Sequence, residues 1–269
     1  MKYLFDNLDQ VRQVIKCVPF GLFTDVDGTI SPIAETPQQA VVWPKCRRFL
    51  KLLSRSLPLV AAISGRDATT LKNMVKVPGM VYIGNHGLER WAGRGTKVRA
   101  DLSHFPAVTS AALAALEPRL KIDGVRLENK GLSASVHYRL AADPEAARQE
   151  ILARVKELPQ ANHLKVLENK MVVDLLPNVA ADKGTALIDL ILEYRLGGGI
   201  YMGDDITDIC AFRALHQTVR ETDFKGYALG VAGTGMPPNL AQEADFTLNG
   251  VADVARFLEW LYQVISQSS

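Results

Sequence analysis

Short apolar runs alternate along most of the chain with longer stretches in which apolar residues recur three or four positions apart. Each run is too short for a typical helix, and polar residues or glycines follow it. This alternation predicts a parallel sheet whose strands are buried on both faces by packed helices. The predicted strands cover residues 22–26, 57–63, 80–83, 200–202, 227–231 and 246–248.

Helical spacing fills the segments between these strands. It predicts helices over residues 8–18, 67–75 and 251–265, and a further helix that begins near Asp182. Residues 36–56 show the same spacing and predict one helix. Its apolar stripe, which we expect to be buried, consists of Trp43, Phe49, Leu50, Leu52 and Leu53.

From about residue 95 the order changes to helix, strand, strand, and this order occurs twice. The first set covers residues 105–120, 125–128 and 132–138, and the second covers 144–158, 164–167 and 171–176. Paired short strands around polar turns are typical of antiparallel sheet. The sequence therefore predicts an α/β fold, with a Rossmann-like parallel core at residues 1–96 and 178–269 and an inserted α+β cap (αββαββ) at 97–177.

Composition and charge narrow the class of protein. With 269 residues, 48% of them hydrophobic, and a net charge of +2, the chain can bury a full core but has no broad basic surface for nucleic acid. Cys17, Cys46 and Cys210 are scattered, so we expect neither a disulfide framework nor a zinc site. No apolar run could span a bilayer, and charge comes too early for a signal peptide. We expect a cytoplasmic monomer without nucleic-acid or membrane partners.

Two carboxylates follow the first predicted strand. Asp25 and Asp27 stand before Gly28, which lets the chain turn. One aspartate of such a pair can attack phosphorus while the other protonates the leaving oxygen, but the same residues also suit a plain turn or a calcium loop. A calcium loop needs an acidic or amide residue at its fifth position and Glu at its twelfth, where this chain has Thr29 and Thr36. The calcium loop is therefore excluded.

Other predicted strands also end in polar residues. Ser64 and Gly65 precede a helix, where a hydroxyl can hold a phosphate oxygen or simply cap the helix. Asn85 and His86 stand between two glycines, which we expect to expose their side chains on a tight loop. Lys183 lies in the first turn of a helix, where a lysine gains nothing from the helix dipole, and this favours a role in binding phosphate.

A third strand end carries several carboxylates. Asp204, Asp205 and Asp208 follow the strand at residues 200–202, an arrangement that needs a cation to neutralise it. Mg²⁺ suits it, because this hard cation prefers carboxylates, water and phosphate oxygens. The carboxyl ends of parallel strands meet at one edge of the sheet, so we expect Asp25 and Asp204 to bind Mg²⁺, with Asp208 either completing the shell or orienting a bound water.

Four sequence motifs resemble those of the haloacid dehalogenase superfamily of phosphotransferases, in the same order. They are Asp25-Val26-Asp27-Gly28-Thr29, Ser64, Lys183, and Gly203-Asp204-Asp205 with Asp208. Within that superfamily the chain is similar to the trehalose-6-phosphate phosphatases, whose cap is inserted at the same place. The residues that carry the nearer resemblance are Asp27-Gly28-Thr29-Ile30-Ser31-Pro32-Ile33, Ile63-Ser64-Gly65-Arg66, Gly84-Asn85-His86-Gly87, Glu128, Lys130, Val136-His137-Tyr138-Arg139 and Lys183-Gly184.

The resemblance implies a role for each matching residue. Asp25 is the nucleophile that forms an aspartyl phosphate, and Asp27 protonates the sugar oxygen and then activates water. The implied phosphate contacts are Thr29, Ser64, Gly65 and Lys183, and the implied Mg²⁺ ligands are Asp25, Asp27, Asp204 and Asp208. The implied contacts with the sugar are Asn85, His86, Glu128, Lys130, Arg139, Glu168 and Asp174.

The sequence departs from the family pattern at two positions, and two alternative functions stay open. Family members often have Glu where this chain has Ile209 and Asp174, and the second difference bears on the choice of sugar. The first alternative substrate class is another sugar phosphate, such as sucrose phosphate, mannosylglycerate phosphate or a hexose phosphate. The other alternative is a sensor that binds a sugar phosphate without turning it over.

Overall fold

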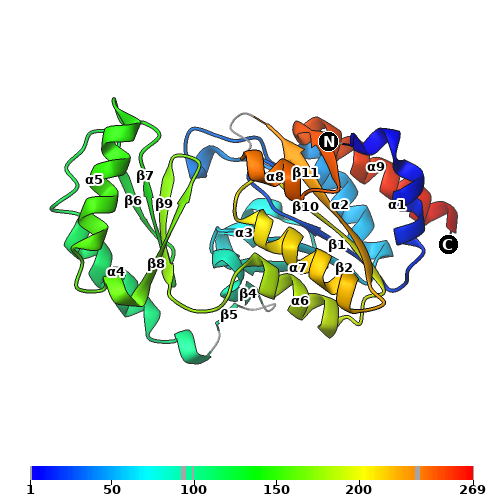
Figure 1. Cartoon of the computed structure of the whole chain (residues 1–269), viewed down its shortest axis with the longest axis horizontal. Coiled ribbons are helices and arrows are strands. Elements are labelled where there is room, and N and C mark those ends of the chain that lie inside the picture. The colour runs from blue at the N-terminus through cyan, green and yellow to red at the C-terminus, as the bar shows by residue number, and fades with distance from the viewer. Residues whose placement is uncertain (1, 92–94, 99, 234–236, 269) are drawn as a thin grey trace. The chain divides into compact units, whose positions relative to one another are not determined.

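The structure is a computed structural model, and it describes residues 2–91, 95–98, 100–233 and 237–268. The chain forms two compact units (Figure 1). Unit 1 comprises Met1–Thr96 and Ala181–Ser269, and unit 2 comprises Lys97–Ala180. The sequence predicts the second boundary at residues 177 and 178, and the roles of the two units as catalytic core and cap stay predictions.

Unit 1 is built on a largely parallel sheet with the strand order β12-β11-β10-β1-β2-β3-β4-β5. The strands from β12 to β3 pair in parallel, whereas β4 is antiparallel to β3. Every residue of β1 and β2 is buried, as expected of strands covered on both faces. The strands are β1 Phe20–Thr24, β2 Leu59–Ile63, β3 Val81–Gly84, β4 Glu89–Trp91, β5 Thr96–Val98, β10 Gly198–Gly203, β11 Lys225–Ala232 and β12 Phe246–Asn249.

The structure confirms the predicted α/β class and adds elements that the pattern did not indicate. The strands β4 and β5 have three residues each and mix charged with apolar side chains, so neither forms a recognisable apolar run. The short helix α8, Pro238–Glu243, buries only Leu240 and gives no apolar stripe. Short 3₁₀ turns are η1 Leu4–Asp6, η2 Pro37–Gln39, η3 Asn85–Gly87, η4 Ala100–Leu102 and η5 Ala161–His163.

Helices cover both faces of this sheet. Alternate residues of a strand point to opposite faces, so Leu22 and Met202 belong to one cluster of buried side chains and Phe23 and Tyr201 to the other. The first cluster includes α2 and α9, and the second includes α6 and α7. The helices of unit 1, apart from α8, are α1 Leu8–Ile15, α2 Pro44–Ser56, α3 Ala68–Val75, α6 Lys183–Glu193, α7 Asp208–Glu221 and α9 Gly250–Ser268.

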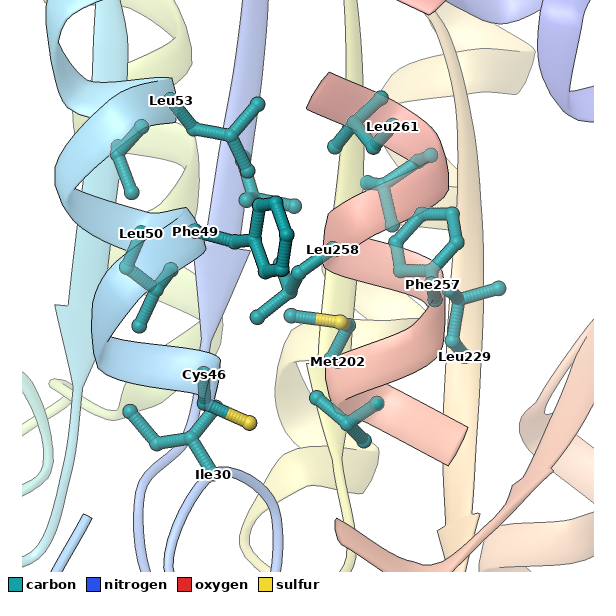
Figure 2. Close-up of a cluster of buried hydrophobic side chains, with 14 of the residues drawn as sticks. Ile30, Cys46, Phe49, Leu50, Leu53, Met202, Leu229, Phe257, Leu258 and Leu261 are labelled. Carbon is teal, nitrogen blue, oxygen red and sulfur yellow. The ribbon is translucent and has the colours of Figure 1, made fainter. Parts of the chain in front are cut away.

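Side chains of α2 and α9 interdigitate over the central strands. Figure 2 shows Phe49 of α2 and Leu258 of α9 against Met202 of β10. This packing fixes the central strands of the sheet and therefore the positions of their carboxyl ends. In the described part of the chain, no helix is long and apolar enough to cross a membrane.

The prediction of one helix over residues 36–56 is wrong in its first part. The α-helix begins at Pro44, and the preceding residues form only the 3₁₀ turn Pro37–Gln39. Trp43 has a ψ of 127°, which is not helical, as expected of the residue before a proline, and 43% of its surface is exposed. The prediction that Trp43 is buried in the core is therefore wrong.

Unit 2 has a four-stranded antiparallel sheet with the order β6-β7-β9-β8. The strands are β6 Arg126–Asn129, β7 Ala134–His137, β8 Leu164–Asn169 and β9 Val172–Pro177, and the helices are α4 Phe105–Leu116 and α5 Pro144–Lys156. Val136 and Val173 of the sheet share one apolar cluster with Ala112 of α4 and Ile151 of α5. Both helices thus cover the same face of the sheet, and the other face carries polar side chains.

Candidate active site

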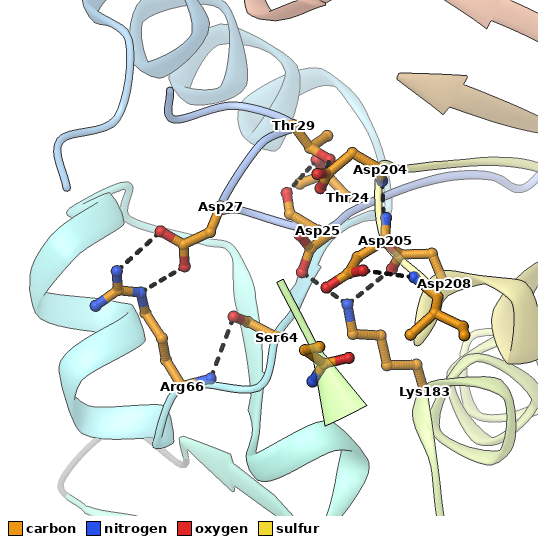
Figure 3. Close-up of polar contacts among 12 residues, drawn as sticks. Thr24, Asp25, Asp27, Thr29, Ser64, Arg66, Lys183, Asp204, Asp205 and Asp208 are labelled. Carbon is orange, nitrogen blue, oxygen red and sulfur yellow. Dashed lines mark hydrogen bonds and ion pairs between the residues drawn. The ribbon is translucent and has the colours of Figure 1, made fainter. Parts of the chain in front are cut away.

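Three strand ends bring polar side chains to one edge of the parallel sheet (Figure 3). Asp25 directly follows β1, and Asp204 directly follows β10, the parallel neighbour of β1. Ser64 directly follows β2, which pairs with β1 on its other side. Ligands of open α/β sheets bind at this edge.

Lys183 links two buried carboxylates at this edge. Its ammonium nitrogen Nζ lies 2.8 Å from Asp25 Oδ1 and 2.7 Å from Asp208 Oδ1. At most 6% of any of these three side chains is exposed. Lys183 is the first residue of α6, and the side chain of Asp182 caps that helix by accepting a hydrogen bond from the Thr185 amide. The lysine is therefore part of the site and not a solvated residue of the helix surface.

The charges at the site shift one another's titration. Burial raises the pKa of the Asp25 carboxyl well above its usual range, and the charges of Asp208 and Asp204 act in the same direction, whereas Lys183 opposes them. Burial lowers the pKa of Lys183, but the carboxylates of Asp208 and Asp25 outweigh it and hold that pKa above its ordinary value. Lys183 is therefore a permanent positive charge at neutral pH.

Asp25, Asp204 and Asp208 form a cluster in which one oxygen of each carboxylate lies within 4.8 Å of the others. All three side chains are buried, and only oxygen atoms are offered. A hard divalent cation such as Mg²⁺ suits the carboxylate oxygens of Asp25 and Asp204, because it would neutralise charge that one lysine balances only in part. The residues present are thus suited to the metal that the sequence predicts.

Two neighbours fix the Asp204 carboxylate. The Thr29 hydroxyl donates a hydrogen bond of 3.2 Å to Asp204 Oδ1, and Thr29 is fully buried. Gly28 has a φ of +92°, and a Cβ atom at this position would lie 2.0 Å from Asp204 Oδ2. A side chain at residue 28 would therefore both strain the turn and displace Asp204. The predicted contact of Thr29 with phosphate stays a prediction.

Asp27 pairs with an arginine that the sequence reasoning did not assign to the site. Arg66 Nε lies 2.6 Å from Asp27 Oδ2, and Arg66 Nη2 lies 2.8 Å from Asp27 Oδ1 (Figure 3). Arg66 also donates to the Pro37 carbonyl, and its backbone amide donates to Ser64 Oγ over 3.3 Å. The cluster of three carboxylates does not include Asp27, so its predicted metal contact stays a prediction.

The loop after β3 lies against the Ser64–Arg66 turn. The amide of His86 donates to the Ser64 carbonyl over 3.0 Å, and the amide of Asn85 donates to the Arg66 carbonyl over 2.8 Å. Asn85 and His86 have positive φ angles of 48° and 58°, which this pairing maintains. A Cβ atom on Gly65 would lie 2.6 Å from the His86 ring, so the missing side chain leaves room for that ring.

The expectation that Asn85 and His86 are exposed is wrong. Asn85 is fully buried and His86 is 6% exposed, because their loop packs onto the neighbouring strand end instead of projecting from it. Flanking glycines indicate a tight loop, but they do not show what the loop packs against. Contact of these two residues with a sugar stays a prediction.

The polar face of the sheet in unit 2 carries three of the predicted sugar contacts, Glu128, Lys130 and Asp174. The register places Glu128, Ser135 and Asp174 side by side across β6, β7 and β9. Asp174 is 3% exposed and accepts hydrogen bonds from Ser135 Oγ and, over 2.7 Å, from Asn169 Nδ2. Lys130 Nζ lies 3.4 Å from Asp174 Oδ1. Polar groups on neighbouring strands thus form one connected network.

Glu168 lies apart from that network, on the other side of the sheet, and its contact with a sugar stays a prediction. It pairs with Val173 of β9, whose side chain is in the apolar core beneath the helices. Successive residues of a strand face opposite sides, so Glu168 lies on the helix-covered side, where Arg148 of α5 binds it at 2.6 Å. The next residue, Asn169, has the correct face and was missed. Arg139 donates to the Lys170 carbonyl over 3.0 Å.

Comparison with known proteins identifies the family of this chain. Residues 23–232 match the family model described as trehalose-phosphatase. A trehalose-phosphate phosphatase of Mycobacterium leprae is 34% identical over 259 residues, which is 92% of this chain and 58% of that protein. A probable trehalose-phosphate phosphatase D of Arabidopsis thaliana is 26% identical over 95% of this chain and 70% of its own length. The chain thus spans little more than half the length of the mycobacterial relative.

Solved structures agree on the fold. The C-terminal domain of the Candida albicans trehalose-6-phosphate phosphatase superposes with a TM-score of 0.78, at 22% identity, over 96% of this chain and 97% of that one. Asp25, Ser64, Lys183 and Asp204 all lie within the matched residues 23–232. The resemblance predicted from the sequence is confirmed, and the chain belongs to the trehalose-phosphatase family.

Proposed function

We propose that this protein is a Mg²⁺-dependent phosphatase that hydrolyses trehalose 6-phosphate to trehalose and phosphate through an aspartyl phosphate. One observation carries the proposal: the buried Asp25 is held 2.8 Å from Lys183 inside a cluster of three carboxylates. This cluster lies within the residues that match the trehalose-phosphatase family. The printed name of the Mycobacterium leprae relative supports the choice of substrate.

The first chemical step uses Asp25 as nucleophile. A carboxylate oxygen of Asp25 forms a bond to phosphorus, and the bond between phosphorus and the sugar oxygen breaks. Asp27 gives a proton to that leaving oxygen, so the sugar departs as a neutral alcohol. The ammonium of Lys183 balances the charge of the nucleophile and of the phosphoryl oxygens at this point.

The second step restores the enzyme. Asp27, now a carboxylate, takes a proton from water as that water attacks phosphorus, and the bond between phosphorus and Asp25 breaks. The products are inorganic phosphate and a free Asp25 carboxylate, while Asp27 again carries the proton. Asp25 and Asp204 would hold Mg²⁺, which when bound neutralises charge on the phosphoryl oxygens.

Sugar binding is assigned to Glu128, Lys130, Arg139 and Asp174 by family resemblance. Each of the many hydroxyl groups of a disaccharide needs a partner once water is expelled, and the polar face of unit 2 offers both acidic and basic groups. Asp174 is shorter than the glutamate often found in the family, and its carboxylate is held by Ser135 and Asn169. The cytoplasmic location and the monomeric state stay predictions.

A screen of substrates tests the proposal. Phosphate release should be faster from trehalose 6-phosphate than from sucrose phosphate, mannosylglycerate phosphate or glucose 6-phosphate, and removal of Mg²⁺ by a chelator should abolish it. Equal rates on all of these substrates would contradict the assignment to trehalose 6-phosphate. Tight binding of trehalose 6-phosphate without phosphate release in Mg²⁺ would instead support the sensor.

Arg66 should matter for the rate because it holds the proton donor. The change Arg66→Lys should lower kcat about tenfold, since a lysine is a point charge that cannot hold both oxygens of Asp27 as the planar guanidinium does. The measurement is kcat and KM for trehalose 6-phosphate. Arg47→Lys is a matched control, because Arg47 donates to the Met74 and Val75 carbonyls and touches none of the site residues. An Arg66→Lys enzyme with unchanged kcat would remove Arg66 from the mechanism.

A further inference from the structure

Tyr201 places a hydroxyl group beneath the site, in a strand that is otherwise built of apolar residues and glycine. It lies in β10, between the parallel neighbours β1 and β11, and is fully buried. Its ring packs edge-on against Phe212 of α7, with ring centroids 5.8 Å apart. A phenylalanine would fill the same space, so core packing alone does not account for the hydroxyl.

The hydroxyl group of Tyr201 is hydrogen-bonded to Asp208. Tyr201 Oη donates to Asp208 Oδ1 over 2.8 Å, and the same oxygen accepts from Lys183 Nζ over 2.7 Å. The other oxygen, Oδ2, accepts from the backbone amides of Asp204 and Asp205, each over 3.0 Å (Figure 3). An ionised carboxylate has about four acceptor positions, so these four donors occupy the whole capacity of Asp208.

This saturation separates the roles of the three clustered carboxylates. With its acceptor positions filled, Asp208 connects Lys183, Tyr201 and the loop carrying Asp204 through hydrogen bonds. Asp25 is different, because Lys183 is its only charged donor among the hydrogen bonds described. The ammonium group of Lys183 therefore donates hydrogen bonds to both Asp25 and Asp208. Its position between them depends on the other groups that hold Asp208.

We propose that Tyr201 is a positioning residue for phosphoryl transfer, acting through Asp208. Its hydroxyl holds Asp208 Oδ1 in the orientation that leaves Lys183 shared with Asp25 and keeps the backbone of residues 204–205 in place beneath the metal ligand Asp204. Without the hydroxyl, Asp208 Oδ1 depends on Lys183 alone, so the lysine moves toward Asp208 and away from the nucleophile. This inference rests on the proposed phosphatase function for its kinetic part.

The test compares Tyr201→Phe with Tyr82→Phe. Tyr82 is a matched control, because it too is buried and its hydroxyl is hydrogen-bonded, but only to the backbone of Val77. The measurements are kcat and KM for trehalose 6-phosphate, Mn²⁺ affinity by titration calorimetry without substrate, and the unfolding temperature. Tyr201→Phe should lower kcat and Mn²⁺ affinity by about tenfold each, as supporting contacts of metal sites do, with KM changed less than about twofold. Tyr82→Phe should change kcat, KM and Mn²⁺ affinity by less than about twofold each.

Two results would overturn the proposal. The first is unchanged kcat and Mn²⁺ affinity in Tyr201→Phe. The second is an equal loss of kcat and Mn²⁺ affinity in Tyr201→Phe and Tyr82→Phe, which would indicate that loss of either hydroxyl loosens the core. A double variant adds an independent check: in an Asp208→Ala background, which removes the acceptor of the Tyr201 hydroxyl, Tyr201→Phe should not lower the unfolding temperature further, and fully additive losses would show that Tyr201 acts elsewhere. If the unaltered protein releases no phosphate from any sugar phosphate, the proposed function is wrong, while Mn²⁺ binding still decides the role of Tyr201.

Discussion

Asp25→Asn should reduce the rate of phosphate release from trehalose 6-phosphate by a factor of about 10⁴ or more, because the amide cannot attack phosphorus and form the covalent intermediate. The fold should survive. The pKa of Asp25 is raised by burial and by Asp208 and Asp204, so its ionised form is costly in the folded protein, and the neutral amide removes that cost. The unfolding temperature at neutral pH should therefore be at least that of the unaltered protein.

The proposed covalent intermediate can be measured directly. Unaltered protein mixed with substrate labelled at phosphorus and quenched in acid should carry the label, whereas Asp25→Asn should not. Asp189→Asn is a matched control, since Asp189 is exposed on α6 and the same substitution there should leave rate and labelling unchanged. A variant at Asp25 that kept more than about a tenth of the activity would exclude this residue as the nucleophile.

The sequence predicts the convergence of the strand ends because two regularities act together. Apolar runs that are too short for helices indicate buried strands, and parallel strands direct their carboxyl ends to one edge. Asp25, Ser64 and Asp204 could therefore be placed near one another from residues far apart in the chain. Small errors in strand bounds did not matter, since β1 ends at Thr24 and Asp25 still follows it directly.

What the sequence does not predict depends on contacts between side chains that no local pattern encodes. Arg66 was noted only as part of a motif that carries the family resemblance, and its pairing with Asp27 could not be predicted because Asp27 precedes it by 39 residues. Glu168 was assigned to the sugar by family resemblance alone, and only the register with β9 shows that it lies on the helix-covered side of its sheet. The role inferred for Tyr201 is of the same kind, since β10 reads as an apolar strand whether residue 201 carries a hydroxyl or not.

Lys183→Met should produce the largest loss of stability. The change leaves Asp25 and Asp208 buried without their shared counter-ion, and breaking a buried ion pair by removing one partner costs about 3 to 5 kcal/mol. For a domain of this size the unfolding temperature should fall on the order of 10 °C. Activity should be lost as well, because Lys183 balances the charge of the nucleophile. Lys51→Met, on the exposed side of α2, is the matched control and should change the free energy of unfolding by less than about 0.5 kcal/mol.

The dependence of this loss on pH distinguishes a charge effect from a packing effect. The folded-state pKa of Lys183 lies above its ordinary value, so its contribution is fully present at neutral pH and is lost only as the pH rises above the ordinary pKa of lysine. In Lys183→Met the charge that opposes the raised pKa of Asp25 is gone, so ionisation of this buried carboxyl makes the folded state less stable as the pH rises. Calorimetry at pH 5 and pH 8 should therefore show a larger deficit, relative to the unaltered protein, at pH 8. A deficit independent of pH would mean that Lys183 stabilises the fold through its aliphatic stem and not through the two carboxylates.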